Sequence, residues 1–365
     1  MADTLYFSRD TQVFVKIGSA IWTMPVLDGF SFSQATNASE VTLNEMSDLS
    51  GNSRRARQMF TDSYAPAEWS FSTYARPFIS AGSGAGAADG AAKHHAVEEV
   101  LWAMMVGDAA YSSNTFTGFT ADATDLDISF ASSNKTTLGT ADIFFVMGGA
   151  GAGTKTAYKI AGCCVNEASL DFDIDGIATI NWSGFGTIIT EQTSPPTVTR
   201  KEAIGDTTNF IRNRLTELTA TSSISGGAIN YALTLTGGSI TMSNNMTFLT
   251  PETLGVINQP LDHVTGTRSI SGSFTCYLSS AANGSMDLWE DLIGAVNTVT
   301  NSFALTFGIG GGSTNAPRVD IAMPACHLEV PVHSIDDIIS VEMNFHALGT
   351  DIESADELSI TYVGK

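Results

Sequence analysis

The chain has 365 residues and a formal net charge of −21, with 17 Lys and Arg against 38 Asp and Glu. A protein that binds nucleic acid tightly needs a basic surface, so this excess of acidic residues argues against a nucleic-acid-binding function. Charged residues make up only 15% of the chain, and Gly occurs 34 times, a mixture that favours β-structure over solvated helices.

The first half of the chain alternates apolar and polar residues in short runs, which predicts β-strands. Residues 1–24 are expected to form an extended N-terminal arm, and residues 25–187 a first domain. Leu43–Tyr64 is a long excursion, and Ser80–Gly90 is a flexible stretch of small residues. The predicted strands of this domain are Leu27–Ser33, Glu40–Asn44, 69–73, Leu126–Phe130, Ile143–Met147, Ala157–Gly162, Val165–Ile174 and Ile177–Gly186, with a hairpin turn at Asp175-Gly176.

A short helix is predicted before Gly107, a plausible helix-ending residue. Five apolar residues there recur at helical spacing and form one stripe, which predicts a helix that lies with one face against the sheet. These residues are Val97, Val100, Leu101, Met104 and Met105.

The second half repeats this organisation. Residues 188–237 are expected to connect two domains, residues 238–350 to form the second domain, and residues 351–365 to form a C-terminal extension that ends in an added strand, Leu358–Val363. A helix is predicted over Ser285–Gly294, with Met286, Trp289, Leu292 and Ile293 on its packed side. The predicted strands are Ser239–Met246, Ser269–Leu278, Ser302–Ile309, Val319–Val330 and Ile338–Leu348.

The two halves also match residue by residue. Leu101-Trp102 to Gly107 and Leu288-Trp289 to Gly294 share one helix pattern, and downstream the halves align at an offset of 163 that places Cys163 on Cys326. The sequence therefore predicts two tandem copies of one mainly β fold, each with one short flanking α-helix. Two fused copies suit equivalent positions in a symmetric assembly better than a single catalytic site.

Motifs that resemble ligand sites are incomplete. Gly148–Thr156 resembles a phosphate-binding loop, but its Lys155 does not follow the last Gly directly, and a strand follows where a helix is needed. Asp171–Gly176 matches the first half of a calcium loop, but the twelfth position is Trp182 instead of Glu. We interpret the first as a hairpin loop and the second as a strand with an acidic face.

No catalytic, cofactor or metal site is expected, and an enzymatic function is not predicted. His94 and Glu98 have the spacing of a metal pair on a helix, but no third ligand is suggested. The four cysteines are interpreted as small buried residues of a protein made in a reducing cytoplasm. No secretory leader or membrane-spanning run is predicted.

The densest basic cluster is Arg54, Arg55 and Arg57, within the Leu43–Tyr64 excursion. It is either a solvated loop, a contact with carboxylates of a neighbouring subunit, or a point of contact with DNA. These three residues are our candidate inter-subunit contacts.

Three segments of the first half resemble bacteriophage tail tube proteins: Met24–Asn37, Glu40–Leu43 and Ala67–Tyr74. The resemblance extends over both repeats. It implies β-sandwich or half-barrel domains whose strands join between subunits around a lumen, in rings that stack into a tube. Because this chain carries two such domains, three chains would fill six quasi-equivalent positions, and a homohexamer is the alternative.

The resemblance implies a virion protein of the tail, assembled in the host cytoplasm, whose lumen conducts phage DNA without sequence-specific binding during ejection. The implied partners are further copies of the chain and other tail proteins: tape measure, terminator, baseplate and, in a contractile tail, a sheath. The long loops Leu43–Tyr64 and Leu249–Thr265 are expected to reach adjacent subunits, and the two chain ends to contact other rings. A distal tail or baseplate hub ring, or a β-sandwich receptor-binding module, are the alternative functions.

Overall fold

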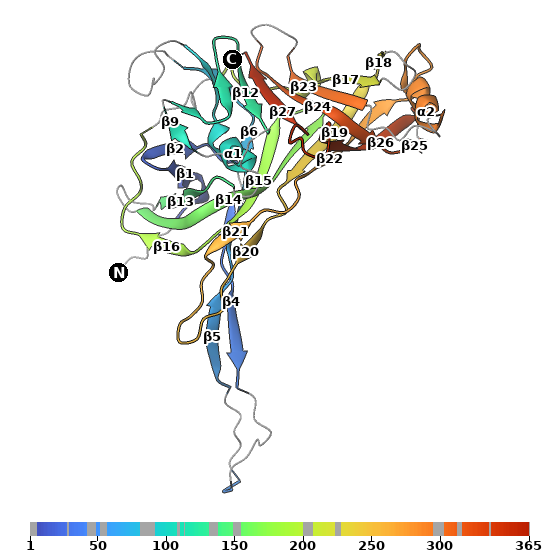
Figure 1. Ribbon diagram of the computed structural model, residues 1–365. Helices are drawn as coiled ribbons and strands as arrows, with labels where there is room; N and C mark the ends of the chain where they lie inside the picture. Colours follow the sequence, from blue (N-terminus) through green and yellow to red (C-terminus); the bar gives the residue numbers. More distant parts are fainter. Residues whose placement is uncertain are drawn as a thin grey trace.

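The computed structural model describes residues 6–27, 29–41, 49–51, 57–80, 92–107, 110–112, 114–130, 138–148, 155–199, 207–222, 228–294, 303–311, 316–335 and 337–364. It forms a broad β-body from which a long hairpin and a shorter one project at the same end (Figure 1). Nineteen of the strands are connected by hydrogen bonds into one sheet system. No helix in the described ranges is long and apolar enough to cross a membrane.

The first half, up to Gln192, contains strands at most of the predicted positions together with several short ones. They are β1 (Gln12–Ile17), β2 (Ala20–Met24), β3 (Ser31–Ser33), β4 (Thr36–Glu40), β5 (Met59–Tyr64), β6 (Ala67–Tyr74), β7 (Pro77–Ile79), β8 (His94–Ala96), β9 (Tyr111–Ser112), β10 (Thr115–Phe116), β11 (Phe119–Ala121), β12 (Asp125–Ser129), β13 (Ala141–Gly148), β14 (Lys155–Asp173), β15 (Thr179–Gly186) and β16 (Ile189–Gln192). The helix of this half is α1 (Glu99–Val106), and a 3-10 turn, η1 (Ser8–Asp10), precedes β1.

The second half begins after a 3-10 turn, η2 (Asn213–Leu215), and its helix is α2 (Ser285–Gly294), with the predicted bounds. Its strands are β17 (Glu217–Ser222), β18 (Ile229–Tyr231), β19 (Leu235–Ser243), β20 (Thr247–Leu249), β21 (Asp262–Val264), β22 (Ser269–Tyr277), β23 (Phe303–Gly310), β24 (Arg318–Leu328), β25 (Val332–Ser334), β26 (Ser340–Leu348) and β27 (Ser359–Val363).

The two halves have the same strand order. In the first, antiparallel pairing runs β3-β6-β15-β14-β13-β1-β2, and in the second it runs β19-β22-β26-β24-β23-β17-β18. One register shift recurs at the same place in both halves: the β13–β14 ladder shifts between Ala141 and Ile143, and the β23–β24 ladder between Phe303 and Leu305. The strands β16 and β27 correspond as well, because they pair with equivalent segments of β14 and β24.

Two of the corresponding segments lie outside the two domains predicted from the sequence. Residues 12–24, expected in an extended arm, form the β1–β2 hairpin, which pairs with β13 and buries Val13, Val15 and Trp22. The 217–231 part of the expected connecting segment forms β17 and β18, which extend the second sheet beside β23. The apolar side chains of these segments explain both placements, because each strand gains a neighbour and a core face.

The C-terminal strand, expected to contact another ring, is integrated in the sheet of its own chain. Strand β27 pairs with β12 of the first half along one edge and with β24 of the second half along the other, so both edges are occupied within the chain. Its side chains Ile360 and Tyr362 are fully buried. The strand therefore joins the two halves (Figure 1).

Two predicted strands, Ala157–Gly162 and Val165–Ile174, are in fact one long strand, β14. Its first part pairs with β13 and β16, and its second part pairs with β15 and β19. The ladder to β15 shifts register between Val165 and Glu167, near the point where the partners change. One strand thus serves two layers, which alternation along the sequence cannot reveal.

The first predicted strands are shorter than expected. Strand β3 covers only Ser31–Ser33 of the predicted Leu27–Ser33, although an isolated bridge joins Val26 to Thr73. Strand β4 ends at Glu40, and residues 42–44 lie outside the described ranges, as do residues 81–90 of the predicted flexible stretch. The Asp175-Gly176 turn follows β14 as predicted, with Gly176 at a φ of 124°, a conformation suited to Gly.

The two helices differ in burial. Every residue of α1 is buried, and Gly107 ends it in the left-handed conformation, so the helix is enclosed on all sides instead of lying with one face on a sheet. In α2 only Ser285 and Leu288 are buried. Met286, Trp289 and Ile293, predicted to face the core, are 47%, 37% and 45% exposed, so the prediction is wrong for these three. The fourth predicted residue, Leu292, is partly buried and packs against the core.

Candidate functional site: the polar sheet face and the junction between the halves

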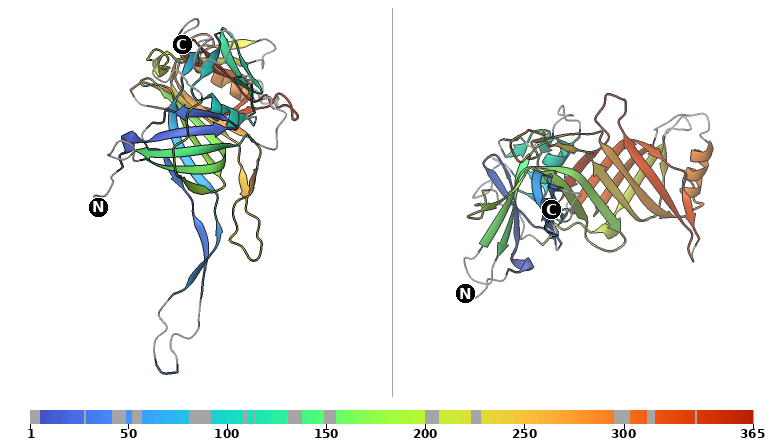
Figure 2. Two further views of the ribbon diagram at one scale, coloured as in Figure 1. Left: turned by 90° about the vertical axis from the view of Figure 1, so that its left-hand side faces the viewer. Right: turned by 90° about the horizontal axis from the view of Figure 1, so that it is seen from below.

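One face of the main sheet carries small polar side chains. Figure 2 shows the strands of both halves side by side in this curved sheet. Along each strand, buried apolar residues alternate with exposed or half-buried ones. The polar residues of β3, β6, β15, the second part of β14, β19, β22, β26 and the end of β24 are Ser31, Ser33, Glu68, Ser70, Ser72, Glu167, Ser169, Asp171, Asp173, Thr179, Asn181, Ser183, Ser239, Thr241, Ser243, Ser269, Ser271, Ser273, Thr275, His327, Glu329, Glu342, Asn344 and His346.

The strand registers arrange these residues in rows across the sheet. One row runs through Ser72, Asn181, Ser169, Thr241 and Ser271, each opposite the next in a neighbouring strand. Ser72 Oγ donates to Asn181 Oδ1 at 2.6 Å, and Asn181 Nδ2 donates to Ser169 Oγ at 3.4 Å. Such cross-strand bonds hold the side chains low against the sheet. The row crosses from the first half to the second without interruption.

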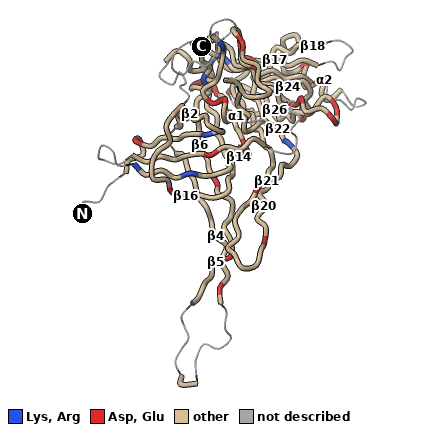
Figure 3. The backbone as a smooth tube through the Cα atoms, turned by 60° about the vertical axis from the view of Figure 1, so that its left-hand side comes forward, with Lys and Arg blue, Asp and Glu red and all other residues tan. Residues whose placement is uncertain are grey.

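The charges on this face are negative. Within the strands just described, the residues of this face include no Lys or Arg but several Asp and Glu. Figure 3 shows where the charged residues lie along the backbone. The Asn344 amide donates to Glu329 at 2.9 Å and is the main reason that the pKa of this carboxyl lies below its ordinary value of 4.5. The carboxylate is therefore ionised at neutral pH. A polyanion near this face meets repulsion and hydroxyl groups instead of counter-charges.

The two halves meet where β14 pairs with β19. Antiparallel pairs run from Glu167 opposite Ser243 to Asp173 opposite Gly237. This junction makes the sheets of the two halves one surface, because β19 pairs on its far side with β22.

Each half contributes one unpaired edge at the ends of this surface. Among the described residues, strand β3 pairs along one side only, with β6, and the β24–β25 edge pairs along one side only, with β26. By strand order, β3 corresponds to β19, and β24–β25 corresponds to the second part of β14. The open edges are therefore the counterparts of the two strands that join inside the chain.

Helix α1 lies at the centre of the internal junction. It packs against β14, and two elements of the second half reach it. Tyr362 of β27 accepts a hydrogen bond from the Trp102 indole at 2.8 Å, and the Asn244 side chain, directly after β19, donates to the Met105 carbonyl at 3.0 Å. Trp102 also packs edge-to-face on Trp182, with ring centroids 4.7 Å apart. The second half thus completes the burial of this helix.

Glu98, at the start of α1, is fully buried in the same junction. Its Oε1 accepts from the Tyr362 hydroxyl at 2.6 Å and from the Arg76 backbone N–H at 3.1 Å. Burial raises the pKa of Glu98 from 4.5 to about 8, and these hydrogen bonds offset only part of that effect. At neutral pH the folded protein therefore holds Glu98 protonated.

This burial predicts a pH dependence of stability. Because the pKa of Glu98 is raised on folding, its contribution is fully present below pH 4.5 and is lost as the pH rises towards about 8. We expect Glu98→Gln, which stays neutral, to unfold at a higher temperature relative to the wild type at pH 9 than at pH 5. Thermal unfolding of both proteins across this range measures the difference. An identical pH slope in both would contradict the assignment.

The hairpin of the second half docks on the first half. In β21, the His263 Nε2 accepts from the Leu138 backbone N–H at 3.0 Å, and its Nδ1 lies 3.3 Å from Cys164 Sγ. Further along, the backbone N–H of Tyr64 in β5 donates to the Asn258 carbonyl at 2.9 Å. The predicted loops Leu43–Tyr64 and Leu249–Thr265 do lie between equivalent strands, and their hairpins β4–β5 and β20–β21 project at the same end (Figures 1 and 2).

Of the candidate inter-subunit arginines, Arg54 and Arg55 lie outside the described residues. Arg57 forms an ion pair with Glu40 at the end of the β4–β5 ladder farther from the body, and both side chains are exposed. An exposed pair of this kind contributes little stability. Arg57 thus has a partner within the chain, and its contact with another subunit stays a prediction.

The other residues singled out in the sequence do not converge on a ligand. The His94 Nδ1 lies 3.4 Å from the Asp122 carbonyl oxygen, whereas Glu98 faces Tyr362, so these two do not form a pair. A search of the described residues finds no group of three or more potential metal ligands. Strands β13 and β14 pair up to Gly148 and Lys155, as a hairpin requires, while residues 149–154 lie outside the described ranges. All four cysteines are free and buried, as predicted.

Comparison with known proteins identifies the family. A sequence profile described as phage tail tube protein matches residues 26–347. The chain belongs to the phage tail tube family. It is also 28% identical over 367 residues to the tail tube protein pb6 of Escherichia phage T5, an alignment that covers 97% of this chain and 75% of that protein. The predicted family and the mainly β fold are confirmed.

This tail tube protein is accordingly a structural subunit and a component of the virion tail. The polar face and the open edges are the features that sequence reasoning missed. The signal was present, since Ser, Thr and Asn recur between apolar residues in the strands of both halves. Alternation shows that two faces exist, but only the pairing of the strands shows that the polar faces of both halves form one surface.

Proposed function

We propose that three copies of this tail tube protein close into a ring of six equivalent domains, and that rings stack into the tube. The internal β14–β19 junction carries the proposal. It joins the two domains through one strand pair. The two outer edges of the same sheet are β24–β25 and β3, the counterparts of β14 and β19. Repeating the junction between chains satisfies both open edges, and a head-to-tail contact of this kind closes into a ring.

In this proposal the repeats are larger than the domains predicted from sequence. The equivalent units run from β1 to β16, residues 12–192, and from β17 to β27, residues 217–363. Matching strand order and matching register shifts support a duplication of the whole unit. The six positions of the ring would then differ only in detail.

The internal registers specify the pairing between chains. Trp182 lies opposite Ala168, and its counterpart Phe345 lies opposite Leu328. On the other strand, Met242 lies opposite Ile270 and Phe32 opposite Trp69, at matching positions. Since Ala168 lies opposite Met242 inside the chain, Leu328 is expected opposite Phe32 of the next copy. The neighbouring pair is then Glu329 and Ser31, both on the polar face.

The hairpins are proposed to contact neighbouring subunits. The second hairpin already touches the first domain through His263, so the β4–β5 hairpin is expected to touch the preceding chain in the same way. Beyond the sheet, Met59, Phe60, Leu254 and Leu261 are exposed apolar side chains. Exposed apolar side chains on two hairpins that project at the same end fit contacts between stacked rings.

The polar face is proposed to line the lumen. Hydroxyl groups and carboxylates, without Lys or Arg among the residues named above for this face, would let DNA pass without adhering. The proposed work of the chain is geometric and involves no chemical step. Its partners would be further copies of itself and the other tail proteins that meet the ends and the outside of the tube.

Cations on this face should make the lumen retain DNA. In Thr241→Arg with Ser271→Arg, each chain gains two adjacent charges on the polar face. We expect short tubes of this variant to retain single-stranded oligonucleotides at low salt and release them as salt rises, because counterion release drives such binding. Fluorescence anisotropy of a labelled oligonucleotide measures it. Tubes of Thr120→Arg, an exposed change on β11 outside this face, should resemble the wild type; equal retention by both variants would contradict the lumen assignment.

Negative-stain electron microscopy of the purified chain tests the assembly itself. Long tubes of stacked rings support the proposal. Single rings that never stack would favour a hub at the end of the tail. A chain that remains monomeric even when concentrated would contradict the tube and favour a β-sandwich binding module.

A further inference from the structure

The two helices, α1 and α2, are equivalent in sequence and topology but not in surroundings. In chain order, α1 lies between β6 and β13, and α2 lies between their counterparts β22 and β23. Trp102 of α1 is 1% exposed and its indole N–H is bonded to Tyr362. Trp289 of α2 is 37% exposed, and within the described part of the chain its indole N–H has no acceptor. One member of the pair therefore lacks the cover that the other has.

The cover of α1 comes from the second half of the chain. Tyr362 lies on β27, and Asn244 directly follows β19. The counterparts of these two strands in the first half are β16 and β3. Register places Thr193, just after β16, at the position of Tyr362, because Gln192 and Thr361 pair with equivalent residues of β14 and β24.

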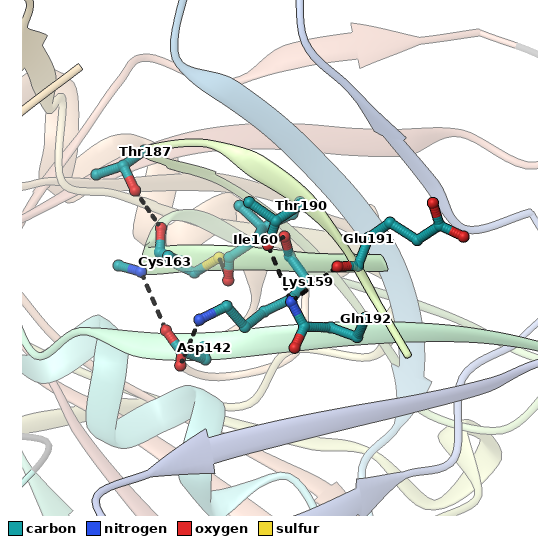
Figure 4. A network of polar contacts seen from close by, with 10 residues as sticks. Asp142, Lys159, Ile160, Cys163, Thr187, Thr190, Glu191 and Gln192 are labelled. Atoms are coloured by element: carbon teal, nitrogen blue, oxygen red, sulfur yellow. Dashed lines mark hydrogen bonds and ion pairs between the residues drawn. The ribbon is translucent and has the colours of Figure 1, made fainter. Parts of the chain in front are cut away.

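The counterpart strands, β3 and β16, are linked through the Gln34 side chain. The Gln34 side chain, directly after β3, accepts from the Ile189 backbone N–H of β16 at 3.0 Å and donates to the Ala65 and Thr187 carbonyls. Figure 4 shows how β16 is anchored on β14, where Thr190 and Gln192 take part in a polar network with Lys159. In the described part of the chain, β16 pairs with β14 alone, whereas β27 pairs on both sides.

The uncovered face of α2 is apolar and adjoins an open sheet edge. Met286, Trp289 and Ile293 lie on one side of the helix, opposite the buried Leu288. The Trp289 ring lies edge-on to His333 of β25, with centroids 6.1 Å apart. Val330 and Val332 of the same edge are also exposed. The apolar surface is thus continuous with the strand edge proposed to join the next chain.

We propose that α2 is the centre of the contact between chains, and that a second copy of this chain covers it with β3, β16 and the residues that follow them. The inference rests on the proposed ring and specifies its interface. Inside the chain, the equivalent helix is buried by the equivalent strands. An apolar surface of this kind, next to unpaired backbone groups, gains from burial in the same way.

Thiol labelling tests this placement. The four native thiols are buried, and burial raises their pKa values, to about 12 for Cys164 and Cys326 and to about 11 for Cys276, so they react slowly with maleimide. Ile293→Cys introduces an exposed thiol on α2. Ile352→Cys introduces one on the exposed turn before β27 and is the matched control.

We expect the unassembled Ile293→Cys protein to label fully and its tubes to label at least tenfold more slowly, while Ile352→Cys labels at similar rates in both forms. Equal labelling of Cys at position 293 in both forms would overturn the placement of α2 but leave the tube standing. Ile293→Lys should also prevent assembly while leaving the melting temperature of the monomer unchanged, and Ile352→Lys should still assemble. If the wild-type chain forms no tubes, the ring proposal and this inference fail together.

Discussion

Val330→Pro is expected to abolish tube assembly and leave the folded chain intact. Val330 lies between β24 and β25 on the open edge, and its side chain is 61% exposed. The preceding backbone N–H, of Glu329, donates inward to the Asn344 carbonyl at 3.0 Å. Backbone groups alternate along an extended strand, so the N–H of Val330 points to the open side. Proline removes this donor and places its ring where a neighbouring strand would pair.

The measurement is paired. Sedimentation or mass photometry follows assembly, and urea unfolding follows stability, which should change by about 1 kcal/mol or less because the site is exposed and its N–H is unused in the monomer. Val330→Thr is the control: it changes the side chain but keeps the N–H, and it should assemble. Tubes of Val330→Pro that form at wild-type concentrations would show that this edge does not join chains.

Trp102→Ala should destabilise the chain far more than Trp289→Ala. Trp102 is buried, packs on Trp182 and bonds to Tyr362, so its removal leaves a cavity and an unpaired hydroxyl acceptor. Truncation of a buried Trp costs about 3–5 kcal/mol. Trp289 is partly exposed and contacts His333, so the same change should cost about 1 kcal/mol in the isolated chain.

For tube assembly, we expect Trp289→Ala to have the larger effect of the two substitutions. Trp289→Ala removes apolar surface from the proposed interface, so the concentration needed for tubes should rise by about tenfold, which corresponds to about 1.4 kcal/mol. Urea unfolding of the monomers and assembly at graded concentrations measure the two effects. Equal losses of stability for both variants would mean that the helices have equivalent surroundings, against the structure.

Alternation of apolar residues was enough to locate the strands that face the core. The patterns around Trp69 and Trp182 predicted β6 and β15, and the bounds of α2 were predicted to the residue. Each of these depends on local periodicity, which burial of one face imposes on the sequence. The internal similarity was also visible, because Gly, Cys and Trp recur at matching positions in the two halves.

Contacts between distant segments were beyond the sequence. Tyr362 lies on a strand that alternates like any other, and nothing local shows that it reaches α1 of the other half. The stripe of α2 predicted burial because a helix with an apolar side normally packs it within its own chain. For Trp289 that rule fails, and an apolar side left uncovered is a feature of a subunit that completes its packing by assembly.

The polar face was hidden for a similar reason. Ser169 and Thr241 each alternate with apolar neighbours, but they become one surface only when β14 pairs with β19. The acidic character of the whole chain was visible, whereas its position on this face depended on register. A shift by one residue would turn every side chain to the other face.

Cross-linking between chains tests the central proposal most directly. Ser31→Cys with Glu329→Cys places two exposed thiols that the registers set opposite each other across the junction between chains, and the native cysteines are all buried. Tubes assembled from this variant, oxidised and then dissolved in denaturant without reductant, should give a ladder of bands that ends at three linked chains, while either single variant should give no ladder. A ladder that continues to six chains, or assembled tubes that do not cross-link at all, would contradict a ring of three chains joined through β3 and the β24–β25 edge.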